Sequence, residues 1–208
     1  MVGQLGLQVE KINMKGRDPV TSILQHLERK PADLIVLATH QRQGHVRWIY
    51  KAVAEPIARQ AGTMTLFVPP KGKGFVSLQD GSVNLQQIVI PIDHAPLSQS
   101  AVDASVWLSQ LVKAPRVSYK VIHIAAEGEM PELRLHHGPG RTWTRTIRRG
   151  DIVDQILRSA DEHATALIVM ATQGHKGFLD ALRGSTTERV IRKTRSLVLA
   201  IQGEPPLD

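Results

Sequence analysis

Residues 166–172 read Ala-Leu-Ile-Val-Met-Ala-Thr, and residues 33–39 read Asp-Leu-Ile-Val-Leu-Ala-Thr. The two segments lie 133 residues apart, and each is a short apolar run of the kind that forms a buried strand in a parallel sheet. The likeness extends to the segments before them, because Asp18–Leu24 matches Asp151–Leu157. A period of this length is typical of tandem copies of one domain and is too long for a solenoid repeat.

The two copies differ in length. About 55 residues precede the repeated part of the second copy and have no counterpart in the first. We therefore predict a partial domain at residues 1–70, a linker at residues 71–85 and a complete domain at residues 86–208. The linker has two short alternating runs on either side of Gln79-Asp80-Gly81, which predicts a hairpin. We expect the function to lie in the complete domain.

The composition is that of a globular protein with one or two ordinary cores, since 42% of the 208 residues are hydrophobic. No run approaches the roughly 18 apolar residues of a membrane span, and the first residues lack a signal-peptide pattern. The chain has no cysteine, which excludes disulfides, cysteine nucleophiles and thiolate metal sites. These features predict a soluble cytoplasmic protein.

The net charge of +7 is spread along the chain. Residues 1–70 carry a net +4, residues 71–85 a net +1 and residues 86–208 a net +2, so no basic arm stands out. Only 4% of the residues are aromatic, which leaves few side chains on which bases could stack. General nucleic-acid binding is therefore disfavoured, whereas the charge still favours anionic ligands, nucleotides included.

In the complete copy, strand patterns alternate with helix patterns. We predict strands at residues 88–92, 117–125, 143–147, 166–171 and 197–201, and helices at residues 98–112 and 151–163 and from residue 185 onward. Residues 126–140 are predicted to be an irregular connection, and residues 143–147 an edge strand. Alternating strands and helices form a parallel sheet with helices on both faces. The predicted fold is therefore α/β, with a doubly wound, flavodoxin-like parallel sheet of five strands and a partial second copy.

The partial copy retains only the later elements. We predict strands at residues 7–13, 34–38 and 64–68 and helices at residues 19–28 and 52–60. The central strand and its neighbour have no counterpart, so the strand at residues 34–38 is expected to have an unpaired edge.

The strand that ends near Ala171 runs into a glycine-rich loop with the features of an anion site. Gly174 and Gly184 let a ligand approach the backbone closely. Ser185 follows directly, and its spacing from Glu188 is that of a capping box, which starts a helix whose N–H groups favour an anion. Many helices begin with a capping box and many turns contain glycine, so a purely structural loop is an equal alternative at this point.

Asp93 adds a second feature to this picture. It follows a predicted strand, and ligands of open α/β sheets bind beyond the carboxyl ends of strands where the strand order reverses. Asp93 and the loop at residues 171–186 are therefore expected to face one crevice. The alternative is that Asp93 caps the following helix or turn.

In combination these residues resemble the universal stress protein family. The resemblance rests on Pro91-x-Asp93 after an apolar strand, on a second strand that contains His123, and on a late glycine-rich loop that closes in Gly184-Ser185. It covers residues 86–203 as a full domain and about residues 5–70 as the later part of another. It implies a nucleotide α-hydrolase-like fold in a tandem arrangement.

The ATP-binding members of that family carry Gly, two residues, Gly, nine residues, and then Gly-Ser or Gly-Thr. The resemblance maps the second glycine onto Gly174, the third onto Gly184 and the hydroxyl residue onto Ser185. The first position is Ala171 here, a departure that adds a methyl group where ribose or phosphate would approach.

The resemblance also implies the remaining ligand contacts. Asp93 would bind adenine, Ala125 would lie near the base, and Ser185 and Thr186 would hold phosphate oxygens. The implied cofactor is ATP, alone or with Mg²⁺.

The partial copy lacks this loop, because Gln41, Lys51 and Ala52 stand where the complete copy has Gly174, Gly184 and Ser185. Its expected role is to contact the complete copy, since family members associate through the last strand of each domain. We therefore expect either a pair of domains within one chain or a homo-oligomer.

No catalytic constellation is present in the sequence. The nine histidines show no spacing typical of metal ligands, and neither a nucleophile elbow nor a Walker motif occurs. The leading hypothesis is a stress-response protein that binds ATP or a related adenine nucleotide in the complete domain and responds to it as a regulator. The alternative is a nucleotide-free module for protein interaction or dimerisation. Slow ATP hydrolysis has no identifiable base.

Overall fold

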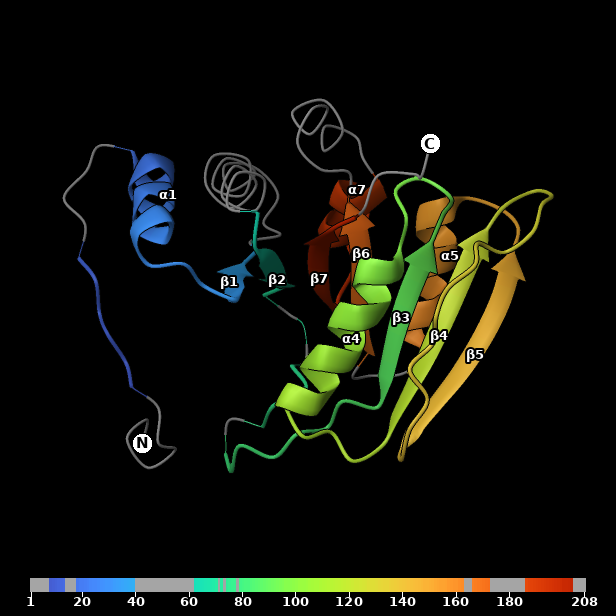
Figure 1. Cartoon of the computed structure of the whole chain (residues 1–208), viewed down its shortest axis with the longest axis horizontal. Coiled ribbons are helices and arrows are strands. Elements are labelled where there is room, and N and C mark those ends of the chain that lie inside the picture. Colours follow the sequence, from blue (N-terminus) through green and yellow to red (C-terminus); the bar gives the residue numbers. More distant parts are fainter. Residues whose placement is uncertain are drawn as a thin grey trace.

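The structure, a computed structural model, describes residues 8–13, 18–39, 62–70, 72, 74–77, 79–162, 166–172 and 186–203. The described helices and strands confirm the expected α/β fold (Figure 1). The helices are α1 (Pro19–Arg29), α4 (Gln99–Leu111), α5 (Ile152–Asp161) and α7 (Thr186–Lys193). The strands are β1 (Leu34–Ala38), β2 (Met64–Val68), β3 (Gln87–Ile92), β4 (Val117–Ile124), β5 (Arg141–Arg148), β6 (Ala166–Thr172) and β7 (Leu197–Gln202).

The strands form one sheet in the order β1-β2-β7-β6-β3-β4-β5. The five strands from β3 to β7 are parallel, as expected for the complete copy, and their order reverses between β3 and β6. β1 and β2 of the partial copy are parallel to each other, and β2 joins β7 in an antiparallel pair. The closing strands of the two copies therefore fuse two sheets into one.

Apolar side chains cover both faces of this sheet. On one face α4 packs over β3, and Ile88, Ile90 and Val102 are fully buried there. On the other face Val89 and Ile168 lie beneath α5, whose Val153 and Ile156 are also fully buried. β-branched residues suit this double burial, because their side chains pack well on a pleated surface.

The connection from β4 to β5 has no helix, as predicted for residues 126–140. It lies on the α4 side of the sheet, where Trp143 stacks on Tyr119 with ring centroids 4.2 Å apart. The hydroxyl of Tyr119 lies 2.6 Å from Oγ of Ser109 on α4. Burial raises the pKa of Tyr119, so this phenol keeps its proton and its hydrogen bond at neutral pH.

The partial copy and the complete copy begin equivalent helices with the same kind of N-cap. Asp18 caps α1 and Asp151 caps α5, in both cases through a carboxylate that accepts backbone N–H bonds in the first turn.

The predicted strand at residues 7–13 is wrong over the described residues 8–13, which are exposed and outside any strand. The physical reason is that the described residues of this copy include no strand with which it could pair. The predicted helix at residues 52–60 lies outside the described residues.

The linker forms the predicted hairpin. Val76 and Val83 make an antiparallel bridge, and the amide of Ser77 donates to the carbonyl of Ser82 at 2.8 Å. Gly81 supplies the positive φ of +73° that this turn requires.

Glu162 at the end of α5 ties that helix to two strands and gives the fold a pH-dependent link. Lys120 of β4 and Arg148 of β5 both pair with its carboxylate, the latter at 3.1 Å. The hydrogen bond from Lys120, followed by that from Arg148, lowers the pKa of Glu162. A lowered pKa in the folded state stabilises the fold above the unfolded pKa, and this contribution is lost as the pH falls through the folded pKa.

We expect Glu162→Gln to reduce the free energy of unfolding at pH 7 by about 0.5–1 kcal/mol, because solvent screens this partly exposed group. The difference between variant and parent should shrink as the pH falls through the lowered pKa of Glu162, because the carboxylate of the parent then becomes protonated as well. Urea unfolding over a series of pH values from 7 downward measures both quantities. A deficit that stays the same across the series would contradict the charge-pair origin.

Candidate functional site

The carboxyl ends of β3 and β6 separate from each other. The β3–β6 ladder covers only Gln87–Val89 and Ala166–Ile168. Each strand nevertheless stays paired with its other neighbour to its end, since Ile92 pairs with His123 and Thr172 with Gln202. The sheet therefore opens at the reversal of strand order, which is where open α/β sheets bind ligands.

Asp93 lies at the β3 side of this opening and is exposed. Its Oδ1 accepts a hydrogen bond from the amide of His94 at 2.8 Å, and its own amide donates to Oγ of Ser98 at 3.4 Å. Asp93 does stabilise its own turn, as the structural alternative expected. Within the described part of the chain its Oδ2 has no hydrogen bond, so one carboxylate oxygen can still accept from a ligand.

Two histidines support the same end of the sheet. His123 is 3% exposed, and its Nδ1 donates to the carbonyl of Ile92 at 3.1 Å. His94 meets the His123 ring edge to face, with centroids 5.4 Å apart, and its Nε2 lies 3.2 Å from the carbonyl of Glu129. The sequence analysis placed His123 on the second strand but overlooked His94, whose only signal in the sequence is its place next to Asp93.

Ala125 follows β4 beside this pair and is half-buried. Its amide donates to the carbonyl of Arg148 at 3.0 Å. A base placed here would therefore meet the Ala125 carbonyl and methyl group, because the N–H is already engaged with β5.

Ala171 and Thr186 mark the other side of the opening. Ala171 is half-buried and packs against the apolar cluster beneath α4. Thr186 is the first residue of α7 and is half-buried, so it lies at the positive end of the helix dipole. The predicted loop residues Gly174, Gly184 and Ser185 lie outside the described residues.

The loop after β3 narrows the opening from the β7 side. A Cβ built on Gly203 would lie 2.7 Å from Cβ of Pro96, so the loop rests directly on the backbone that follows β7. The amide of Gly203 also donates to the carbonyl of Thr172 at 2.7 Å. This part of the end of the sheet is thus closed by protein atoms.

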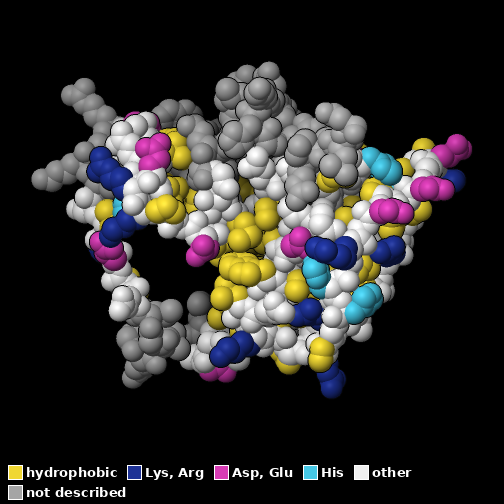
Figure 2. Space-filling model, in the orientation of Figure 1, with side chains coloured by type: hydrophobic (Ala, Val, Ile, Leu, Met, Phe, Trp, Pro, Cys, Tyr) yellow, Lys and Arg dark blue, Asp and Glu magenta, His cyan; other side chains and the backbone are white. Residues whose placement is uncertain are grey.

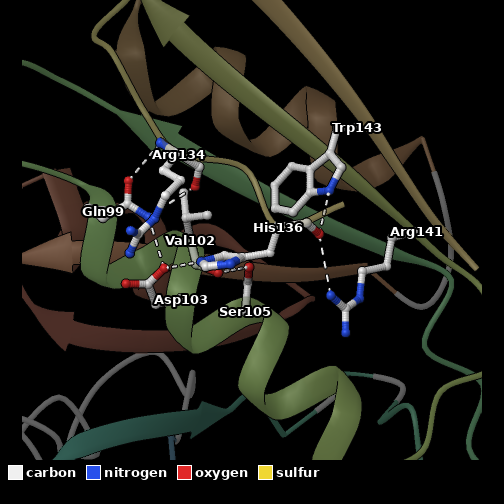
Figure 3. A network of polar contacts seen from close by, with 8 residues as sticks. All are labelled: Gln99, Val102, Asp103, Ser105, Arg134, His136, Arg141 and Trp143. Carbon is white, nitrogen blue, oxygen red and sulfur yellow. Dashed lines mark hydrogen bonds and ion pairs between the residues drawn. The ribbon is translucent and has the colours of Figure 1, made fainter. Parts of the chain in front are cut away.

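The connection after Ala125 is held over α4 by a polar network (Figure 3). The Gln99 amide donates to the carbonyl of Arg134 at 3.1 Å and accepts from its amide at 2.9 Å. Asp103 lies 2.6 Å from Nε2 of His136, whose carbonyl accepts from Nε1 of Trp143 at 3.3 Å. These contacts fix a segment that contains no helix or strand of its own.

A surface hollow of about 520 Å³ lies on this connection, lined by Glu132, Leu133, Arg134 and Arg145. Among the described residues, none of the predicted nucleotide-binding residues Asp93, Ala125, Ala171 and Thr186 lines it. Among the described residues, no group of three or more His, Asp or Glu side chains gathers where a metal ion could bind. Within the same residues, every helix is too short or too polar to cross a bilayer.

Comparisons with known proteins show which family the chain resembles. A family model described as the universal stress protein family matches residues 3–69 and 113–202, well over half of the chain. No curated protein sequence matches the chain significantly.

Two solved structures are similar in fold. A universal stress protein from Archaeoglobus fulgidus DSM 4304 has a TM-score of 0.61 and 18% identity, over 90% of this chain and 66% of that one. A functionally unknown protein from Pseudomonas aeruginosa PAO1 has a TM-score of 0.58 and 15% identity, over 91% of this chain and 69% of that one. At these identities the likeness concerns the fold alone, and the present chain spans about two thirds of the length of each protein.

Proposed function

Because the chain belongs to the universal stress protein family, we propose that it is a stress-response protein that binds ATP or a related adenine nucleotide between the carboxyl ends of β3 and β6. The observation that carries this proposal is the early end of the β3–β6 ladder at Val89 and Ile168. It leaves backbone and side-chain groups of both strands facing an opening at the reversal of strand order.

The residues around the opening suit an adenine nucleotide. Oδ2 of Asp93, which accepts no hydrogen bond from the residues that the structure describes, is an acceptor for amino or hydroxyl groups of a nucleoside. The carbonyl of Ala125 is a further acceptor on the same side. Thr186 begins a helix, and a hydroxyl at that place together with the helix dipole favours phosphate oxygens. In this proposal Gly174, Gly184 and Ser185 complete the phosphate loop.

Ala171 is compatible with this arrangement. Its methyl group packs against the apolar cluster under α4. The side chain is therefore accommodated by protein atoms. Bound nucleotide would order the loop at residues 172–186 and so change the surface that a partner protein meets. We propose this change as the regulatory step, in a cytoplasmic protein, with no chemistry on the nucleotide required.

A nucleotide-free interaction module is the second candidate, and two contacts favour it. β2 and β7 already join the copies into one sheet, and Pro96 rests on Gly203 at the end of β7. If this region serves to hold the two copies together, the glycine-rich loop and Asp93 have only a structural role and bind no nucleotide.

Isothermal titration with ATP, with and without Mg²⁺, separates the two candidates once co-purified nucleotide has been removed. We expect saturable binding of about one nucleotide per chain, since one of the two copies carries the loop. Titration with GTP under the same conditions is the control for base recognition. Absence of both binding and co-purified nucleotide would favour the interaction module.

A further inference from the structure

The hollow on the connection between β4 and β5 has the size and the chemistry of a ligand site. Its volume of about 520 Å³ falls within the range of small-molecule sites, which is roughly 300–1,000 Å³. In Figure 2 basic, acidic and histidine side chains gather on this part of the surface, over α4 and β5. We propose that the hollow, through Glu132, Leu133, Arg134 and Arg145, binds a small phosphate monoester that also carries hydroxyl groups.

The two arginines of the hollow keep their charges available for a ligand. Elsewhere on β5 the guanidinium of Arg148 pairs with the carboxylate of Glu162 at 3.1 Å. Within the described ranges, by contrast, no carboxylate pairs with the guanidinium of Arg134 or Arg145. Arginine groups of this kind bind phosphate oxygens through paired, charge-assisted hydrogen bonds.

Arg145 is held at the wall of the hollow by β5 and by one hydrogen bond. Alternation along the strand places Arg145 on the same face of the sheet as Trp143, which is the face over which the connection runs. Nη2 of Arg145 donates to the carbonyl of Leu133 at 3.2 Å. A guanidinium has several further N–H donors, so this bond fixes the group and leaves donors for a ligand.

Arg134 is positioned through its backbone, which leaves its side chain free. The Gln99 amide of α4 holds the N–H and the C=O of Arg134 at 2.9 and 3.1 Å (Figure 3). Leu133 packs against the apolar cluster on the α4 side of the sheet. The nearby carboxylate of Asp103 is engaged by Nε2 of Gln99 at 2.9 Å and by Nε2 of His136 at 2.6 Å. The wall of the hollow is thus preorganised, which reduces the entropy that binding costs.

The charges of the lining select the class of ligand. A phosphate monoester offers three acceptor oxygens to two guanidinium groups, whereas the two oxygens of a carboxylate are satisfied by one such group. Glu132 is exposed, and its ionised carboxylate only accepts hydrogen bonds, so it suits hydroxyl groups of the ligand. With Arg134 and Arg145 opposed by Glu132 alone, the described lining still favours an anion. A hydroxylated phosphate ester satisfies both signs of charge.

The test is a titration of the full chain, followed by ¹H–¹⁵N NMR, with glucose 6-phosphate as the probe. Glucuronate has the same kind of ring with a carboxylate in place of the phosphate, and glucose has no charge. We expect saturable binding of glucose 6-phosphate, clearly weaker binding of glucuronate and no binding of glucose. Arg134→Gln should weaken the binding of glucose 6-phosphate about tenfold or more, because charge-assisted hydrogen bonds are lost while the backbone bonds to Gln99 remain.

Arg149→Gln is the matched control, since Arg149 is also exposed but does not line the hollow, and it should bind like the parent. The indole N–H signal of Trp143, which donates to the carbonyl of His136, shows whether the connection keeps its place in each variant. Equal affinity of Arg134→Gln and Arg149→Gln, no binding to the parent, or tighter binding of glucuronate would overturn the proposal. Loss of binding in Gly184→Lys would also overturn it, because the phosphate would then bind at the glycine-rich loop.

Discussion

Gly184→Lys is expected to abolish saturable ATP binding, with affinity reduced by at least about 100-fold. The change copies Lys51, which stands at the equivalent place in the partial copy. In the proposed site the backbone around Gly184 approaches phosphate oxygens, and a long side chain there displaces them. Two or more charge-assisted hydrogen bonds of about 1.5–3 kcal/mol each are then lost, which accounts for the expected factor. Isothermal titration of variant and parent with ATP measures it.

Gly177→Ala is the matched control for Gly184→Lys. Gly177 belongs to the same glycine-rich segment but to no position of the nucleotide motif, so its variant should bind ATP within severalfold of the parent. Far-ultraviolet circular dichroism should show unchanged folding for both variants. If Gly184→Lys bound ATP as tightly as the parent, the phosphate-loop assignment would be wrong.

The internal repeat made most of the fold predictable. Residues 166–172 and 33–39 predicted β6 and β1, and the alternation of strands and helices predicted the parallel sheet of the complete copy. These predictions rest on local chemistry: β-branched apolar runs form buried strands, and Asp151 and Asp18 cap helices wherever their side chains reach free N–H groups.

Contacts between residues that lie far apart in the chain could not be predicted from the sequence. Residues 8–13 were predicted to lie in a strand but form none, because a strand needs a neighbour and the described residues of this copy supply none there. The bonds from Gln99 to Arg134 and the contact of His94 with His123 join residues whose spacing carries no signal. For the site, sequence indicated Asp93, Ala125, Ala171 and Thr186 near the strand ends, but not that the β3–β6 ladder stops early.

Gly140→Ala is expected to destabilise the fold by about 2–5 kcal/mol. Gly140 lies just before β5 with φ at +72°, and a Cβ there would be 2.3 Å from the carbonyl oxygen of Pro115. The contact is with backbone, so no side-chain rotation relieves it. The carbonyl of Gly140 also accepts from the amide of Val117 at 2.8 Å, at the start of the β4–β5 pair. The left-handed conformation costs a non-glycine residue about 1–2 kcal/mol, and overpacking adds about 1–3 kcal/mol.

Gly81→Ala separates these two causes. Gly81 has nearly the same φ, +73°, but a Cβ there would meet nothing within 4 Å. Its variant should therefore lose only the conformational part, about 1–2 kcal/mol. Urea unfolding of both variants gives the difference, which measures the clash with Pro115 alone. Equal losses would contradict the close approach of residues 115 and 140. A larger loss for Gly140→Ala would mean that this glycine fixes how β5, and with it the connection that follows Ala125, is joined to the sheet.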